Sequence, residues 1–336
     1  MKKKFALISI FIYILCIFTG CKKSDESTLN IYTTTEDEYI DSYINGFNEK
    51  YPDIKLNIVR DSTGVITSKL LAEKENPQAD VIWDLAATSL VKIDKTGMLQ
   101  EYKPNNIDKL NEKFIDLNNK IPHWIGVSLW ANAFTVNINE LEKKNIVIPQ
   151  SYNDLLLPEY KNEISMPNPS SSGTGYMVIS SLIQSWGEEK AWQYLDKLNN
   201  NIKQYDHSGS APIKSTAMGE QLIGIGMRGE SLREEKNSPQ IKTVFPKEGL
   251  AWDLDGIALV KKDNIKEESK KFIDWILSID AMNIESKERN RIVTYKELAN
   301  QSIYPKNFFE ILMKNDIKFS SDNRERIIEE WNKRYK

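Results

Sequence analysis

Cysteine, histidine and long apolar runs are scarce in this sequence of 336 residues. Both cysteines, Cys16 and Cys21, precede residue 22, which excludes a disulfide framework or a multi-cysteine metal site from the body of the chain. His123 and His207 are the only histidines, and no Gly-x-Ser-x-Gly or His-Glu-x-x-His motif occurs, so nothing singles out a catalytic centre. Since 45 Lys and Arg residues face 48 Asp and Glu residues, the basic excess of a nucleic-acid binder is also missing.

The first 21 residues are typical of a secretory signal. Lys2, Lys3 and Lys4 precede an apolar run of 14 residues, which is shorter than the roughly 20 residues that a spanning helix needs. An uncut membrane anchor is the alternative interpretation. Residues 18–21 (FTGC) resemble a bacterial lipobox, which implies cleavage before Cys21 and attachment of lipid to its sulfur.

We therefore predict a lipoprotein signal peptide at 1–20 and a polar tether at 21–27. The mature body would lie in the cell envelope, anchored by lipid to a membrane and facing the periplasm or the exterior. The remaining sequence contains no second apolar stretch of spanning length.

The pattern of the body predicts an α/β fold of two lobes. Short β-rich runs at 29–33, 54–59 and 79–83 alternate with helical patterns, and this order predicts a parallel sheet with crossover helices. Thr35 and Glu38 match a capping box for the first of these helices.

A second unit of strands and helices follows from residue 131. We predict a first lobe formed by 28–130 plus 256–336 and a second lobe formed by 131–255. Two chain connections between the lobes would form a hinge, and the ligand would bind in the cleft between the lobes.

Four turns rich in serine, threonine and glycine precede predicted helices, at 33–35, 61–64, 170–175 and 208–210. A helix N-terminus carries unpaired N–H groups and partial positive charge, so such turns can bind an oxyanion without lysine or arginine. Each turn alone is equally explained by ordinary helix capping. Their number favours an anion site with the candidate residues Thr34, Thr35, Ser62, Thr63, Gly64, Ser171, Ser172, Gly173, Thr174, Ser208 and Ser210.

The segments around these turns carry a resemblance to a known family. Residues 61–83 resemble the substrate-binding proteins of 2-aminoethylphosphonate ABC transporters, which form a wider cluster with ferric-iron and polyamine binders. Further matches lie at 166–175, 207–210 and 252–255, so the resemblance spans most of 29–262. It implies a two-lobe periplasmic-binding fold of type II that closes on its ligand and delivers it to a separate permease and ATPase.

A 2-aminoethylphosphonate ligand needs a carboxylate or an aromatic face for its ammonium group. The candidates for this end of the ligand are Tyr32, Trp83, Asp84, Trp252, Asp253 and Asp255. Trp83 and Asp84 stand at the carboxyl end of a predicted strand, where ligands of open α/β sheets bind. Core packing explains the tryptophans equally well, and helix or turn capping explains the acids.

Three alternatives stay open at this point. A ferric-iron binder of the same fold would use phenolate and carboxylate oxygens, but no Tyr-Tyr pair occurs. A hydrolase of organophosphorus compounds would need a catalytic pair that the sequence does not single out. A chemoreceptor partner or an adhesin would lack a transporter. We expect a monomer that binds a small anion, with no enzyme activity, no cofactor, no metal and no nucleic-acid partner.

Overall fold

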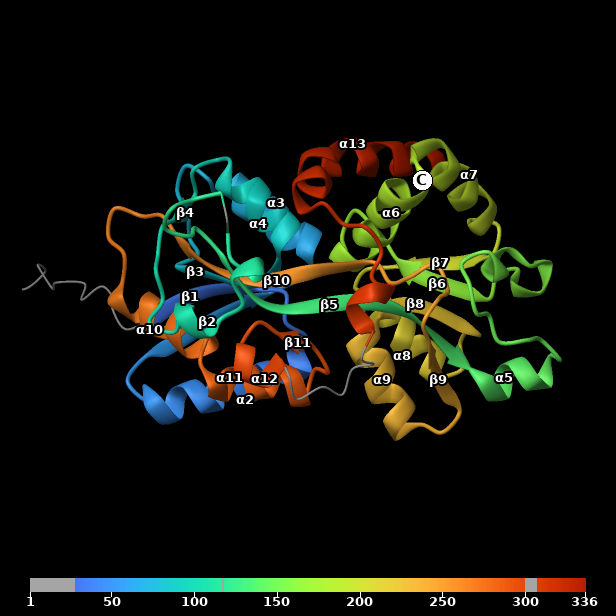
Figure 1. Ribbon diagram of the computed structural model, residues 1–336, viewed down its shortest axis with the longest axis horizontal. Coiled ribbons are helices and arrows are strands. Elements are labelled where there is room, and N and C mark those ends of the chain that lie inside the picture. The colour runs from blue at the N-terminus through green and yellow to red at the C-terminus, as the bar shows by residue number, and fades with distance from the viewer. Residues whose placement is uncertain (1–27, 117, 300–306) are drawn as a thin grey trace, which may run out of the picture.

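A computed structural model describes residues 28–116, 118–299 and 307–336 of the protein (Figure 1). The expected signal peptide, Cys21 and the tether lie outside these residues. The described chain forms two α/β lobes side by side, joined by strands that run from one into the other (Figure 1).

Eleven strands of the described chain form one continuous mixed sheet. The strands are β1 (Thr28–Thr33), β2 (Lys55–Arg60), β3 (Val81–Ala86), β4 (Leu99–Gln100), β5 (Ile125–Asn137), β6 (Ile164–Pro167), β7 (Ile202–Asp206), β8 (Ile223–Met227), β9 (Ile241–Val244), β10 (Trp252–Val260) and β11 (Ile292–Val293). Their main order is β2-β1-β3-β10-β5-β8-β6-β7, while β4 pairs with β10, and β9 and β11 pair with β5. We call the half with β1, β2 and β3 the first lobe and the half with β6, β7 and β8 the second lobe.

Helices cover both faces of this sheet (Figure 1). They are α2 (Asp37–Lys50), α3 (Thr63–Ala72), α4 (Ala87–Asp94), α5 (Ile138–Lys143), α6 (Gly173–Trp186), α7 (Glu188–Leu198), α8 (Ala211–Ala217), α9 (Arg228–Asn237), α10 (Glu267–Ile276), α11 (Ile279–Lys287), α12 (Lys296–Ala299) and α13 (Ile317–Tyr335). Short 3-10 turns occur at Ile107–Lys109, Glu112–Phe114, Asp154–Leu156, Pro158–Tyr160 and Phe308–Ile311.

The first lobe confirms the predicted β-α-β-α-β order. Strand β1 pairs in parallel with both β2 and β3, which requires α2 and α3 to act as crossovers. Helix α2 packs on one face of the sheet through Tyr39, Tyr43 and Phe47, and α3 packs on the other face through Ile66 and Leu70. The carboxyl ends of β1 and β2 therefore lead into the turns at 33–35 and 61–64 along one edge of the sheet.

The predicted capping box at the start of α2 is wrong. Helix α2 begins at Asp37, and its N-cap residue Glu36 makes no capping hydrogen bond with its side chain. The Thr35 hydroxyl donates instead to Asp84 Oδ2 at 2.8 Å, because the turn folds back on the end of β3. Glu38 pairs with Lys214 and Arg233 of the second lobe.

Two long strands carry the chain between the lobes. The first half of β5 pairs with β10 and β11, and its second half, from Asn132 onward, pairs with β8 and β9. Strand β10 returns to the first lobe, where Asp255 lies opposite Ala86 of β3. These antiparallel strands are the two connections that the sequence predicts, and they form the base of the cleft.

The C-terminal segment makes a third connection that the sequence did not predict. The backbone at Ile311 and Met313 hydrogen-bonds to Leu250, and α13 then packs against both α4 and α6. Ile327 and Trp331 of this helix belong to the core of the second lobe. The expected limits 28–130, 131–255 and 256–336 stay a prediction, but the last helix lies across both lobes (Figure 1).

Candidate functional site

A cavity that opens to solvent lies between the two lobes. Its walls are formed by Thr34, Glu36, Arg60, Ser62, Thr63, Trp130, Ser172, Gly173, Thr174, Ser208, Gly209, Met227, Asp255 and Arg291. All four predicted turns therefore contribute to one cavity. Two of the turns come from the first lobe and two from the second, and the hinge strands supply Trp130 and Asp255.

Two helices point their N-termini at this cavity. Helix α3 begins at Thr63, and the hydroxyl of its N-cap residue Ser62 is buried without a hydrogen-bond partner. Helix α6 begins at Gly173, and its N-cap residue Ser172 accepts a hydrogen bond from the Gly175 amide. The partial positive charges of the two helix ends thus meet from opposite lobes, which favours an anionic group between them.

The guanidinium of Arg60 strengthens the positive side of the cavity. Arg60 ends strand β2, and its Nε donates to the Thr35 carbonyl at 3.0 Å, which fixes the side chain beside the first two turns. Its nearest carboxylate is that of Asp37, at 3.9 Å, so most of its charge is left for a ligand. An arginine here combines charge with directional donors for an oxyanion.

Four of the predicted anion-site residues lie behind the cavity wall. The Gly64 amide donates to the Ser171 carbonyl at 2.7 Å, which joins the two lobes. The Ser171 hydroxyl donates to the His207 carbonyl at 2.8 Å, and Ser210 lies 3.3 Å from the Ser208 hydroxyl. Together with Thr35, these residues stabilise the turns, and the neighbouring residues of the same turns form the cavity wall.

Of the residues predicted for the amine end, Asp255 lines the cavity. Trp83 is fully buried in the first-lobe core, where its ring lies 4.8 Å from that of Tyr43. The Tyr32 hydroxyl donates to the carboxylate of Glu73, the residue that follows α3. Both side chains therefore stabilise the fold. For Trp83 this agrees with the interpretation as a core residue.

The other three predicted residues are also held elsewhere. The Trp252 indole donates to the Met313 carbonyl at 2.8 Å, and this contact anchors the third connection. Asp253 is buried and accepts a hydrogen bond from the Thr88 hydroxyl at 2.8 Å. Asp84 lies beneath the cavity in a buried network of charges.

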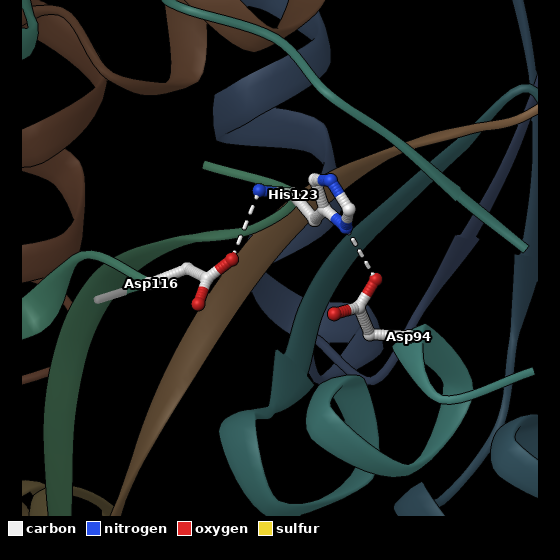
Figure 2. A group of neighbouring side chains, drawn as sticks. All are labelled: Asp94, Asp116 and His123. Carbon is white, nitrogen blue, oxygen red and sulfur yellow. Dashed lines mark hydrogen bonds and ion pairs between the residues drawn. The ribbon is translucent and has the colours of Figure 1, made fainter. Parts of the chain in front are cut away.

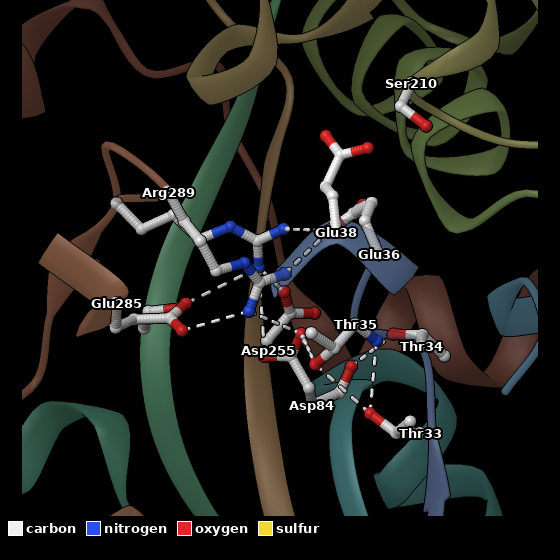
Figure 3. A network of polar contacts seen from close by, with 12 residues as sticks. Thr33, Thr34, Thr35, Glu36, Glu38, Asp84, Ser210, Asp255, Glu285 and Arg289 are labelled. Atoms are coloured by element: carbon white, nitrogen blue, oxygen red, sulfur yellow. Dashed lines mark hydrogen bonds and ion pairs between the residues drawn. The ribbon is translucent and has the colours of Figure 1, made fainter. Parts of the chain in front are cut away.

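That network is centred on Arg289, which is fully buried (Figure 3). Its guanidinium contacts Glu36 at 3.0 Å, Asp84 at 2.7 Å and Glu285 at 2.9 Å. These three acids come from the start of α2, the end of β3 and α11. Arg289 thereby ties together the elements from which Thr34 and Glu36 reach the cavity.

Asp84 adopts a left-handed backbone with φ of 59°. Such a conformation is uncommon for a residue with a side chain and persists where the surroundings hold it. The Thr34 hydroxyl donates to its carbonyl and the Thr35 hydroxyl to its carboxylate. Asp84 therefore positions the 33–35 turn (Figure 3).

A second buried arginine, Arg291, reaches the cavity itself and pairs with Asp255. Burial would raise the pKa of the Glu36 carboxyl, but the charges of Arg289 and Arg291 outweigh burial and lower it. For Asp255, burial and the neighbouring Asp84 charge prevail and hold its pKa well above the ordinary range. Both acids of the cavity thus already face guanidinium groups.

Sequence reasoning missed six cavity residues, namely Glu36, Arg60, Trp130, Gly209, Met227 and Arg291. Arg60 could have been found, because it stands at the carboxyl end of a predicted parallel strand. Met227 ends β8, which pairs in parallel with β6, in the same way. Arg291 had no local signal, since it arrives from a distant part of the sequence through the pairing of β11 with β5.

The two histidines make hydrogen bonds with carboxylates. His123 Nδ1 lies 2.6 Å from Asp94 Oδ1, and its amide donates to Asp116 at 3.1 Å (Figure 2). The Asp116 carboxylate also accepts hydrogen bonds from Asn118 and Asn119. Because donors between Asn118 and His123 occupy both oxygens of Asp116, we interpret this cluster as hydrogen bonds that stabilise the loop.

His207 contributes to the contact between the lobes. Its Nε2 lies 2.8 Å from Asp61 Oδ1, which brings the fourth turn against the second. The hydrogen bond lowers the pKa of the Asp61 carboxyl below its usual range, in spite of partial burial. With the Gly64–Ser171 bond and the ion pairs of Glu38, this contact shows the cleft in a closed arrangement.

Comparison with known proteins is consistent with this geometry. No helix in residues 28–116, 118–299 and 307–336 is long and apolar enough to cross a membrane. The structure of the periplasmic binding protein AfuA from Actinobacillus pleuropneumoniae, with exogenous fructose-6-phosphate bound, is 31% identical; the match covers 92% of this chain and 98% of AfuA with a TM-score of 0.82.

Two sequence relatives extend the comparison. An uncharacterized protein of Haemophilus influenzae is 28% identical over 98% of this chain and 97% of its own length. A Salmonella typhi protein that carries the provisional name of 2-aminoethylphosphonate-binding periplasmic protein is 27% identical over 68% of this chain and 66% of its own length. The family model for bacterial extracellular solute-binding proteins matches residues 76–318, which is more than half of the chain. This chain therefore belongs to the bacterial extracellular solute-binding proteins, the non-enzymatic binding components of ABC importers.

Proposed function

We propose that this solute-binding protein captures a small organic phosphate, with a phosphorylated sugar as the first candidate, for delivery to an ABC permease. The observation that carries the proposal is the convergence of four hydroxyl-rich turns and Arg60 on one cavity. Five or six charge-assisted hydrogen bonds of roughly 1.5–3 kcal/mol each exceed the roughly 8 kcal/mol of a micromolar complex, which leaves room for the costs of binding.

The far end of the cavity favours a hydroxylated group over a bare ammonium. Asp255 and Glu36 could attract a cation, but each is already paired with a buried arginine. Paired carboxylates and guanidiniums together accept and donate hydrogen bonds, which suits neutral hydroxyl groups. The indole of Trp130 offers an apolar face to a sugar ring. The fructose-6-phosphate in the similar AfuA structure supports the same class of ligand.

The ligand that the sequence suggested, 2-aminoethylphosphonate, is the second candidate. Its phosphonate would occupy the same positive end, and Glu36 and Asp255 would face its ammonium. The name of the Salmonella typhi relative supports it. A ferric ion is supported less, because no tyrosine occurs among the described residues that line the cavity.

A thermal-shift screen, followed by titration calorimetry, tests the proposal. We expect fructose 6-phosphate to raise the melting temperature, because a ligand that binds the folded state stabilises it. Fructose without phosphate and inorganic phosphate should each raise it less. A larger shift with 2-aminoethylphosphonate would select the second candidate. A response to ferric salts or spermidine with none to either phosphorus compound would refute an organophosphorus ligand.

We also propose that lipid on Cys21 anchors the protein to a membrane, as the lipobox resemblance of 18–21 implies. The monomeric state expected from the sequence is part of the same proposal. Size-exclusion chromatography with light scattering tests whether the protein is a monomer.

A further inference from the structure

Glu230 is a buried carboxylate without a visible partner. It lies in the first turn of α9, the residue is 1% exposed, and neither carboxylate oxygen has a hydrogen-bond partner in any other residue that the structure describes. An ionised carboxylate in such a place is costly unless a proton, a cation or a donor compensates it. Glu230 follows the cavity residue Met227 by three positions, so it lies close to the ligand site without forming its wall.

The surroundings of Glu230 belong mostly to the other lobe. The Arg228 guanidinium donates to the Asn290 carbonyl at 2.7 Å, and Gly229 packs against the backbone carbonyl of Arg289 so tightly that a side chain has no space. One turn later, Arg233 pairs with Glu38 and lies over the ring of Tyr39. The start of α9 is thus pressed against α2 and the segment 289–291 of the first lobe, and opening the cleft would separate these surfaces.

The charges that face Glu230 are unbalanced. From α2 it meets Glu36 and the unpaired hydroxyl of Tyr39, and from the segment after α11 it meets Arg289 and Arg291. From its own helix, Arg233 is close enough for the Glu230 charge to raise its pKa, and that side chain pairs with Glu38. The two buried arginines already serve four other acids, which are Glu36, Asp84, Asp255 and Glu285.

We propose that closure of the cleft is coupled to the uptake of one proton by Glu230, so that the unliganded protein closes more readily in acid than at neutral pH. In the open form, the Glu230 carboxyl would face water and ionise as an ordinary glutamate. On closing, it enters the acid-rich cluster of the first lobe, where the protonated form is favoured. The inference rests on the proposed function only in taking the cleft as the place where ligand is held.

The sign and size of the effect follow from linkage. Burial and the Glu36 charge raise the pKa of Glu230 in the closed form from 4.5 to about 7. Because the closed form binds the proton more tightly, closure is favoured below that pKa and is weakened as the pH rises through it. With these two pKa values, closure becomes about tenfold less favourable between pH 6 and pH 8.

Calorimetric titration of fructose 6-phosphate at several pH values tests the proposal on Glu230→Gln, with Glu189→Gln as the control. Glu189 is an exposed acid on α7, away from the cleft. The ligand phosphate titrates in the same range, but identically for each variant, so the difference between variants isolates Glu230. We expect affinity to fall about tenfold more between pH 6 and pH 8 in the unchanged protein and the control than in Glu230→Gln. Equal pH slopes for all three would overturn the coupling.

Small-angle scattering without ligand separates this proposal from the identity of the ligand. We expect the radius of gyration of the unchanged protein to be smaller at pH 5.5 than at pH 8, and that of Glu230→Gln to be small at both. A radius that is independent of pH in both proteins would refute the proton coupling even if the sugar phosphate binds. If the radii behave as expected but fructose 6-phosphate does not bind, the proton coupling stands and the proposed ligand is refuted. Should the variant fail to fold, a radius of the unchanged protein that does not change with pH still refutes the coupling.

Discussion

Replacing Gly64 with alanine should prevent the lobes from closing without harming the first lobe itself. Gly64 lies in the first turn of α3, and a Cβ there would stand 2.8 Å from the Ser171 carbonyl oxygen and closer still to that of Ser170. Real Cβ atoms essentially never approach an oxygen below 3.0 Å, so the two lobes would have to separate. The change would also break the hydrogen bond from the Gly64 amide to Ser171.

The loss of affinity can be worked out from these contacts. Forcing an extra methyl group into a packed contact costs about 1–3 kcal/mol, and the lost hydrogen bond adds about 1 kcal/mol. The sum of about 2–4 kcal/mol corresponds to binding that is about 30-fold to 700-fold weaker. The unliganded variant should melt no lower than the unchanged protein, since alanine favours a helix more than glycine by about 0.8–1 kcal/mol.

Titration calorimetry with fructose 6-phosphate measures this effect, with Ser68→Ala as the matched control. Ser68 is exposed one turn further along the same helix, and its hydroxyl bonds only to the Gly64 carbonyl. The control should bind as the unchanged protein does. Unaltered affinity in Gly64→Ala would mean that α3 and the 170–171 turn do not meet in the liganded state, and the closed cleft described above would be the wrong geometry.

Further changes separate the roles of the site residues. Arg60→Ala should weaken fructose 6-phosphate binding by about 1.5–3 kcal/mol and leave binding of unphosphorylated fructose unchanged, as calorimetry would show; equal losses would place Arg60 outside the phosphate site. Asp84→Asn should lower the melting temperature, because it breaks a buried pair worth about 3–5 kcal/mol with Arg289, and should weaken both candidate ligands alike; a loss confined to 2-aminoethylphosphonate would return Asp84 to the amine role. Burial raises the pKa of Asp253 to about 7, so folding stability should fall as the pH rises from 4 to 7, and Asp253→Asn should flatten this fall in melting curves; an unchanged slope would contradict the assignment. Cys21→Ser should release the protein from membrane fractions, and retention there would support an uncut anchor.

Local patterns in the sequence were enough to predict the parallel strands and the turns that follow them. Alternation at 29–33 and 79–83 arises from the two-residue period of a strand, and the Ser/Thr/Gly turns are set by helix capping and backbone freedom. Both are properties of adjacent residues. The convergence of the four turns on one cavity followed from a general rule, since parallel strands end at the same edge of a sheet.

What failed depended on contacts between distant residues. In α2, Ile40, Ile44 and Phe47 recur at helical spacing, but the buried residues are Tyr39, Tyr43 and Phe47, while the two isoleucines stay partly exposed. The Tyr43 hydroxyl donates to Glu285, a buried acid whose charge Arg289 balances, and no pattern near residue 43 reveals that contact.

The amine-end prediction failed for a related reason. The rule that ligands bind at strand ends pointed to the end of β3, but no residue of β3 lines the cavity, and Asp84, with its left-handed backbone, pairs with Arg289. A backbone conformation of this kind is selected by tertiary contacts. Trp83, one residue earlier, faces the aromatic cluster of α2 and α10 for the same reason.

The final helix has a practical consequence for anyone who handles this protein. Near the end of α4, Lys92 and Lys95 form ion pairs with Glu325 and Asp322 of α13, respectively. At the other end of α13, Arg334 forms an ion pair with Asp196 of α7. A tag or fluorophore attached at the C-terminus would consequently follow a helix that contacts both lobes, and it could disturb those contacts. Fluorophores that report opening of the cleft should be attached to α5 and α10 instead, where they would not disturb α13.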